Sequence, residues 1–230
     1  PIWKILGGKF GKNIKLYRAI SQEDADTMSK KVKKYKKEGY TKFQLKVGGD
    51  PNEDIERIKL VRSILNNSDV LIADANTGWL MHDALKVIKA TEHLDIYYEQ
   101  PCISYEENLA IRKKTKNPFI LDENIDSIQS FLRAFNDHAM DIINIKISKL
   151  GGITKSRLLR DLCVELGIAM TIEDSWGGDI ATAAISHLAH STPEKFLFSS
   201  TDFNSYNSFN YTIESPKREG GCISASNKPG

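Results

Sequence analysis

Residues 42–74 read KFQLKVGGDPNEDIERIKLVRSILNNSDVLIAD, and this stretch contains the repeating unit that decides the fold. The short apolar runs Lys42–Val47 and Val70–Asp74 are predicted to be buried strands. Between them, Pro51–Leu65 is predicted to be a helix, because proline suits the first helical turn. A strand, a helix and a second strand in this order predict a parallel βαβ unit.

The same alternation continues along the chain. Six further strands are predicted at Lys15–Ile20, Ile96–Glu99, Phe119–Asp122, Ile142–Ile147, Ile168–Ile172 and Phe196–Ser199. A helix follows almost every strand, for example Gly152–Leu166, which Gly167 is expected to end. A doubly wound open sheet shares this alternation, but eight units of about 25 residues favour an α/β, TIM-like (β/α)7β barrel. The residues after Asp202 lose the rhythm and are expected to form a closing loop or an extra hairpin.

The composition is that of a globular domain with an ordinary charge balance. The 230 residues are 40% hydrophobic and 27% charged, and the net charge of +2 gives no reason to expect a nucleic-acid partner. The basic run Lys30–Lys37 is predicted to be the solvated face of an amphipathic helix. No apolar run is long enough to predict a membrane span. Three scattered cysteines without a CxxC pair fit a reducing cytoplasm. Separately, we expect the protein to form a homo-oligomer.

Acidic residues end three successive predicted strands, at Asp74, Glu99 and Asp122. Catalytic groups in such barrels lie at the C-terminal ends of the strands, so these carboxylates are expected to converge. Three like charges need a cation, and carboxylate oxygens suit Mg²⁺. Any one acid alone is better explained as a helix cap or a loop charge. The residues expected to cap these helices are Asn76, Ser104 and Asp126.

Two lysines lie at corresponding places on two other predicted strands. Alternation puts Gln44 and Lys46 on one face of their strand, and Asn144 and Lys146 on one face of theirs. These strands are the second and sixth of eight, so the lysines are expected on opposite sides of a barrel. A bound substrate would then have one lysine on each face of its α-carbon. Alternatively, each lysine reaches out to solvent at the barrel rim.

Five short motifs resemble the muconate-lactonizing-enzyme and mandelate-racemase branch of the enolase superfamily. They are Gln44-Leu45-Lys46, Asp74-Ala75-Asn76, Glu99-Gln100-Pro101, Asp122-Glu123 and Asn144-Ile145-Lys146. The resemblance implies that Asp74, Glu99 and Asp122 bind Mg²⁺ and that Lys46 and Lys146 are the acid/base pair. It leaves Glu123 as a supporting residue that could compete with Asp122 for the metal. Lys149 lies beyond the strand and is not chosen.

The motif on the second strand departs from the family pattern. The usual Lys-x-Lys is Gln44-Leu45-Lys46 here, so an amide replaces one charge and is expected to contact the substrate. The wider set of motifs looks like the subgroup acting on proline-type substrates, which includes hydroxyproline-betaine 2-epimerases and cis-3-hydroxy-L-proline dehydratases. Trp176 is a candidate cation–π contact for the substrate nitrogen or a packing residue. Asp174 is a candidate partner for a substrate cation or a helix cap.

The resemblance also bears on domain organisation. The family carries an N-terminal α+β capping domain before the barrel, and Pro1–Gly8 looks like the junction into the first strand. We therefore expect residues 1–230 to be the C-terminal barrel domain without its capping domain, shortened at both ends.

The leading functional hypothesis is Mg²⁺-dependent removal and return of the proton next to a substrate carboxylate, which epimerises a proline betaine or a similar small molecule. The second hypothesis is dehydration of cis-3-hydroxy-L-proline after the same first step. A third, of another class, is a non-catalytic barrel that only binds a ligand. The five histidines show no metal spacing, and Cys102 has no nearby histidine, so neither is expected to take part in catalysis.

Overall fold

The computed structural model describes residues 1–228 and divides into two compact units. The first unit joins Pro1–Tyr17 to the chain from Ile142 onward, and the second is Arg18–Asp141. Eight strands follow one another in the sheet in sequence order, from β2 (Tyr17–Ile20) to β9 (Leu197–Ser200). This order, with helices between successive strands, confirms the predicted α/β, TIM-like (β/α)7β fold.

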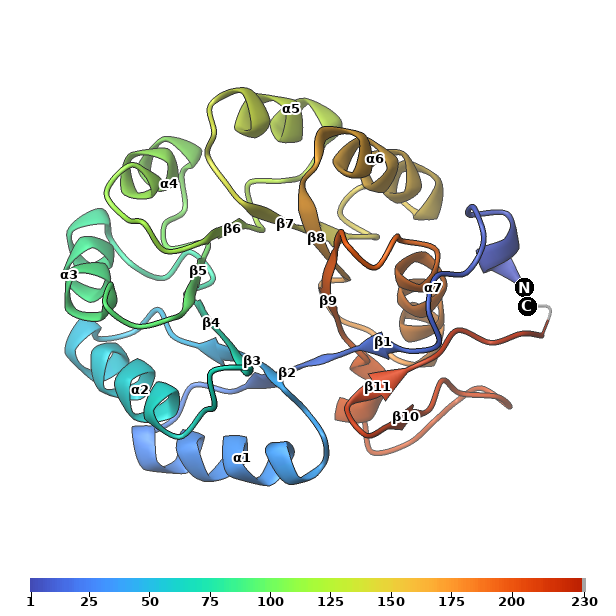
Figure 1. Ribbon diagram of the computed structural model, residues 1–230, viewed down its shortest axis with the longest axis horizontal. Coiled ribbons are helices and arrows are strands. Elements are labelled where there is room, and N and C mark those ends of the chain that lie inside the picture. Colours follow the sequence, from blue (N-terminus) through green and yellow to red (C-terminus); the bar gives the residue numbers. More distant parts are fainter. Residues whose placement is uncertain (229–230) are drawn as a thin grey trace. The chain divides into compact units, whose positions relative to one another are not determined.

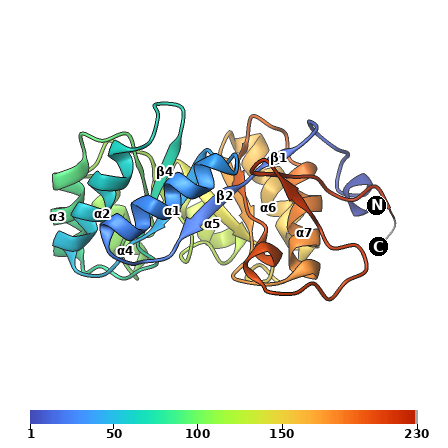
Figure 2. The ribbon, with the colours of Figure 1, turned by 90° about the horizontal axis from the view of Figure 1, so that it is seen from below.

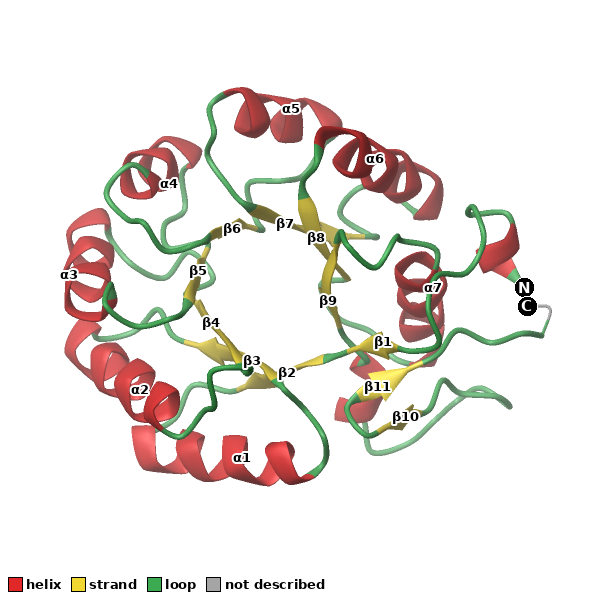
Figure 3. Ribbon diagram, in the orientation of Figure 1, coloured by secondary structure: helices red, strands yellow, loops and turns green. Residues whose placement is uncertain are grey.

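The second unit alternates helices with parallel strands, and α1 to α4 cover one side of those strands (Figures 1 and 3). Its elements are α1 (Ala25–Lys37), β3 (Lys42–Lys46), α2 (Pro51–Ser63), β4 (Val70–Asp74), α3 (Met81–Thr91), β5 (Tyr97–Glu99), α4 (Tyr105–Arg112), β6 (Phe119–Leu121) and α5 (Ile128–Asn136). The strands are buried, with Leu71, Tyr98 and Phe119 fully enclosed. In α1, Val32 is buried while its lysines lie on the outside or at the edge, which confirms the predicted amphipathic helix.

The first unit continues the pattern with two helices that lie side by side (Figures 1 and 2). Its main elements are β7 (Ile142–Lys146), α6 (Ile153–Leu166), β8 (Ala169–Glu173), α7 (Asp179–His190) and β9. A separate antiparallel sheet holds β1 (Ile14–Lys15), β10 (Arg218–Glu219) and β11 (Cys222–Ile223). The short helices η1 (Ile2–Lys4) and η2 (Phe203–Tyr206) complete the unit. The segment after Asp202 that was expected to form a closing loop or an extra hairpin, residues 204–215, contains most of η2 followed by a loop without strands, and the β10–β11 hairpin lies just beyond it.

The predicted strand boundaries hold to within one or two residues, with two differences that matter. The run Lys15–Ile20 is two strands, because Leu16 interrupts the pairing and donates its backbone N–H to Gly221. Strand β8 extends to Glu173, one residue beyond the predicted end, so this strand ends in an acid, as β4 does with Asp74 and β5 with Glu99.

Helix ends follow local chemistry. Helix α2 begins at Pro51 with Asp50 as its cap, and α6 ends at Gly167, whose φ of 76° is left-handed. Ser104 caps α4 as predicted. Two other predicted caps are wrong. Helix α3 begins after Leu80 and α5 after Ser127, so Asn76 and Asp126 lie too early in their loops to cap these helices.

Two of the five histidines are buried in α7 and serve as hydrogen-bond acceptors within the first unit. His187 Nδ1 accepts the Trp3 backbone N–H at 3.3 Å, and His190 Nδ1 accepts that of Ala225 at 3.1 Å. Burial lowers the pKa of both imidazoles below the ordinary value of 6.5, and the nearby Lys9 acts in the same direction. These contacts give the pair a structural role within the first unit. No helix within residues 1–228 has the length and apolar character needed to span a bilayer.

We predict that acid weakens the first unit through this histidine pair. The unfolded chain takes up protons near pH 6.5, whereas the folded imidazoles resist protonation, so the free energy of unfolding falls as pH drops below about 6.5. Denaturant titrations of wild type and of the double variant His187→Asn/His190→Asn between about pH 5 and 8 measure this slope. The double variant should lose part of it, while substitution of the exposed His82 should leave it unchanged. An identical slope in all three proteins would contradict this account.

Candidate functional site

The ends of β3, β4 and β5 bring three predicted site residues to one level. Parallel register pairs Lys46 with Asp74, and Asp74 with Glu99. Glu99 pairs with Ile120, and Asp122 follows two residues later, just past the end of β6 at Leu121. The side chains of all three acids are almost fully buried, with at most 1% of their surface exposed.

Lys46 is bound to the carboxylate at the end of the neighbouring strand. Its ammonium forms an ion pair with Asp74 Oδ2 and donates to Asn76 Oδ1 at 2.9 Å. Asn76 also donates its backbone N–H to Asp74 Oδ1 at 2.9 Å and its side-chain amide to Glu123 at 3.2 Å. Asn76, predicted only as a cap, therefore links the lysine to two acids. Its position two residues after Asp74 in the DAN motif was the available signal.

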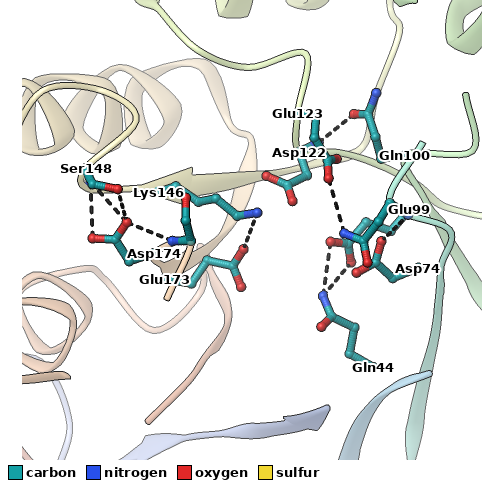
Figure 4. Close-up of polar contacts among 12 residues, drawn as sticks. Gln44, Asp74, Glu99, Gln100, Asp122, Glu123, Lys146, Ser148, Glu173 and Asp174 are labelled. Carbon is teal, nitrogen blue, oxygen red and sulfur yellow. Dashed lines mark hydrogen bonds and ion pairs between the residues drawn. The ribbon is translucent and has the colours of Figure 1, made fainter. Parts of the chain in front are cut away.

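Gln44 contacts the second acid. Its side-chain N–H₂ group lies 3.1 and 3.2 Å from the two oxygens of Glu99, and Figure 4 shows the amide directed at that carboxylate. Gln44 is itself buried. The side-chain N–H₂ group of Gln44 is thus directed at Glu99. A contact with the substrate would have to use the side-chain oxygen of Gln44, or the amide would first have to turn away from Glu99.

Gln100 ties the end of β5 to the segment that carries Asp122. Its side-chain oxygen accepts the backbone N–H of Asp122 at 3.0 Å, and its side-chain nitrogen donates to Asn124 at 2.7 Å. Asn108 from α4 donates to the same Asn124 oxygen at 2.9 Å. This buried amide network fixes the backbone on which Asp122 is mounted.

The backbone is strained next to two of the acids. Among residues 1–228, four non-glycine residues have a positive φ, and three of these are Asn76 (44°), Thr77 (67°) and Gln100 (38°). They directly follow the ends of β4 and β5. Such conformations cost free energy and concentrate where the surrounding structure fixes a functional group.

Asp54, which is fully buried in α2, organises the loop after Lys46. Its Oδ2 accepts the backbone N–H groups of Gly48 and Gly49 at 2.9 Å and the Trp79 indole N–H at 2.8 Å. Its Oδ1 accepts from Arg57 at 2.8 Å. The loop has no room for a side chain at Gly48, since a Cβ there would lie 2.3 Å from the Ala75 carbonyl oxygen. Asp54 therefore holds the loops after β3 and β4 together.

We predict that Asp54→Ala lowers the free energy of unfolding by about 3–5 kcal/mol, because it removes the buried acceptor of three N–H groups and one of the two carboxylates that pair with the buried Arg57 guanidinium. Equilibrium urea denaturation of the full-length protein measures the loss. Asp50→Ala, which removes an exposed cap from the same helix, is the matched control and should cost about 1 kcal/mol. Equal losses of unfolding free energy in the two variants would show that the Asp54 contacts stabilise the protein no more than an ordinary helix cap does.

The three acids fit a hard divalent cation by their chemistry. They bring three buried carboxylates from three successive strands, and oxygen donors of this kind are what Mg²⁺ prefers. No group of three His, Cys, Asp or Glu side chains within residues 1–228 is already arranged around a common point as a metal site. In the structure, Lys46 and Gln44 are the groups placed on Asp74 and Glu99.

The first unit contains the other lysine and an acid, Glu173, that was not among the predicted site residues. Lys146 at the end of β7 is in register with Glu173 at the end of β8, and its ammonium lies 3.7 Å from Glu173 Oε1. Tyr17 donates its hydroxyl to Glu173 Oε2 at 2.5 Å. Glu173 follows the apolar end of its strand, as Asp74 and Glu99 do, so the same pattern could have identified it. Lys149 lies in the turn after β7, as expected.

The other predicted residues of this unit lie just after β8. Asp174 accepts hydrogen bonds from the hydroxyl and backbone N–H of Ser148 (Figure 4). It also accepts the backbone N–H of Ser175 at 2.7 Å. The alternative that Asp174 caps the next helix is wrong, because Gly178 is the N-cap of α7. Trp176 is 59% exposed and lies beside Phe203 and Tyr206 in tilted ring contacts, with ring centroids 5.4 and 5.7 Å away.

The thiols do not look like nucleophiles. Burial raises the pKa of Cys102 to about 11, with Glu107 and Asp83 adding to the shift, and burial also raises the pKa of Cys163. Both are therefore protonated near neutral pH, which agrees with the expectation that Cys102 is not a nucleophile.

Large apolar side chains are exposed in the loops that follow the acids. Leu80, after β4, is 64% exposed, and Ile103, after β5, is 73% exposed. These residues flank the ends of the strands that carry Asp74 and Glu99.

Comparison with known proteins gives a family and several relatives. Residues 27–230 match the family model described as enolase C-terminal domain-like. A cis-3-hydroxy-L-proline dehydratase from Roseibium aggregatum is 56% identical over 230 residues, which is 100% of this chain and 63% of that protein. An N-succinyl-L-Arg/Lys racemase from Bacillus cereus is 29% identical over 195 residues, covering 83% of this chain and 53% of that protein.

A solved structure shares the fold throughout. The crystal structure of an enolase-superfamily member from Roseovarius nubinhibens ISM, complexed with magnesium, matches with a TM-score of 0.94 and 28% identity. The match covers 100% of this chain and 63% of that one. This chain thus spans less than two thirds of the length of these relatives.

Proposed function

Since the chain belongs to the enolase C-terminal domain-like family, we propose that it carries the catalytic groups of an enzyme that removes the proton next to a substrate carboxylate. The observation that carries the proposal is the cluster of Asp74, Glu99 and Asp122, buried at successive strand ends with Lys46 bound to the first of them. Buried acids in such number are costly to stability unless they serve a cation or a reaction.

We assign Asp74, Glu99 and Asp122 as ligands of one Mg²⁺ ion, with Glu123 and Asn76 supporting them. The magnesium complex of the structural relative supports this choice of metal. When bound, Mg²⁺ supplies positive charge that makes the α-proton more acidic and stabilises the enediolate. Lys46 would then have to move away from Asp74, because the ion and the ammonium compete for the same carboxylate.

Lys46 and Lys146 are assigned as the acid/base pair. Once Lys46 leaves Asp74 it can give up its proton, become an amine and accept the α-proton, and the second lysine can return a proton to the carbon. The presence of lysine at the end of both β3 and β7 supports a reaction that needs two proton-transfer groups.

The substrate is proposed to be a proline-type carboxylate. The 56% identity to a cis-3-hydroxy-L-proline dehydratase favours loss of water from such a substrate, one of the two reactions considered from the sequence. The racemase among the relatives keeps epimerisation of a proline betaine or a related molecule as the second candidate. Gln44, Asp174 and Trp176 are assigned to substrate binding, with the Trp176 ring offered to a substrate nitrogen.

We also propose a location and an assembly state. The three cysteines are free, which supports the proposal of a reducing cytoplasm. The proposed assembly is a homo-oligomer, and sedimentation analysis of the full-length protein tests this.

We predict that the full-length protein binds one divalent cation per chain through the acidic cluster. Asp74→Asn removes one ligand charge and should weaken Mg²⁺ or Mn²⁺ binding by at least about 10-fold while leaving the fold intact. Isothermal titration of the purified protein with the metal measures this. Glu106→Gln, which removes a surface acid from the same unit, is the control and should bind as wild type does. If Asp74→Asn binds the metal with unchanged affinity, the proposed metal site is wrong and the non-catalytic alternative is supported.

We predict that removal of each lysine separates the two reactions. Epimerisation needs a proton removed on one face and delivered on the other, so Lys46→Ala and Lys146→Ala should each abolish it. Dehydration can proceed with a single base, so one of these variants should still eliminate water from cis-3-hydroxy-L-proline. Proton NMR in D₂O follows both products and the exchange of the α-proton. Full activity of both variants on every substrate would refute the acid/base assignment.

A further inference from the structure

Strand β8 ends in an acid that the proposed chemistry does not use. Glu173 is 2% exposed, and it lies between the phenol of Tyr17, itself 4% exposed, and the ammonium of Lys146. All three residues belong to the first unit. We propose that Glu173 and Tyr17 are positioning residues that hold Lys146 in its working position, an inference that rests on the proposed function of Lys146.

The two oxygens of Glu173 face different partners. Oε2 accepts the Tyr17 hydroxyl at 2.5 Å, and Oε1 lies 3.7 Å from Lys146 Nζ (Figure 4 shows the latter contact). A hydrogen bond from a phenol to a carboxylate is short and directional. It prevents the carboxylate from rotating, so the oxygen that faces Lys146 stays in place.

A lysine needs such an anchor more than most catalytic groups do. Its side chain has four rotatable bonds, and a base that strays from its proton by about 1 Å can lose rate on the order of 100-fold. Lys146 keeps 14% of its side chain exposed, so it has room to move. Glu173, which lies opposite Lys146 in the strand register, restricts that movement.

The carboxylate paired with Lys146 differs from the one paired with Lys46 in its proposed relation to the metal. Lys46 is paired with Asp74, which is proposed to bind the metal, so that ion pair competes with metal binding. Glu173 is outside the proposed metal ligands, so its contact with Lys146 does not compete with the metal. Lys146 can therefore stay paired with Glu173 when the metal is bound, whereas Lys46 has to leave Asp74.

Two conservative substitutions in the full-length protein test the inference. Tyr17→Phe removes only the hydroxyl, and Glu173→Gln keeps the shape of the side chain but removes its charge. The control is Tyr98→Phe, which removes a buried hydroxyl bonded to Thr91 at 2.7 Å in the second unit. For each protein we would measure kcat and KM on cis-3-hydroxy-L-proline and a proline betaine, the metal affinity, and the crystal structure.

We expect Glu173→Gln to lower the kcat of the step that uses Lys146 by about 100-fold, and Tyr17→Phe by about 10-fold. KM and metal affinity should change less than about threefold, and Glu173→Asp should recover part of the rate. The crystal structures should show Lys146 Nζ displaced or disordered in both variants and unchanged in Tyr98→Phe.

The inference is overturned if Lys146 keeps its position in the crystal structures of both variants, or if kcat stays within twofold of wild type while Lys146→Ala is inactive. If Lys146→Ala is itself fully active, the proposed function fails, and the position of Lys146 in the variant structures alone decides whether Glu173 and Tyr17 hold it.

Discussion

Parallel register is the constraint on which the site depends. Because β3, β4 and β5 pair in parallel, their ends coincide, and Lys46, Asp74 and Glu99 come to one level without any contact between distant loops. The buried charges that result need local compensation, which the structure supplies with the Lys46 ion pair and the Gln44 amide. The loops that follow are then fixed by Asp54 and Gln100, so the carboxylates stand on a rigid support.

Much of this arrangement was readable from the sequence, because it is local. An acid that directly ends an apolar run must lie at a strand end, and alternation fixes the face of Gln44 and Lys46. The strand positions and the fold class were therefore predicted correctly. The same pattern also identifies Glu173, once the strand is extended by one residue.

Other parts of the site depend on contacts between residues far apart in the chain. Tyr17 and Glu173 are 156 residues apart, and nothing in either local pattern indicates their hydrogen bond. Asn76 was assigned to a cap because its residue type favours that role. Its backbone is instead left-handed, a conformation that asparagine adopts more readily than most residues, and its side chain contacts Lys46 and Glu123, which are 30 and 47 residues away in the chain.

A crystal structure of the full-length protein grown with Mg²⁺ would show whether the three carboxylates hold one divalent cation. We expect a single ion about 2.1 Å from an oxygen of each of Asp74, Glu99 and Asp122, with the Lys46 ammonium displaced from Asp74. A well-ordered structure at saturating Mg²⁺ in which Lys46 still binds Asp74 and no ion lies among these carboxylates would contradict it.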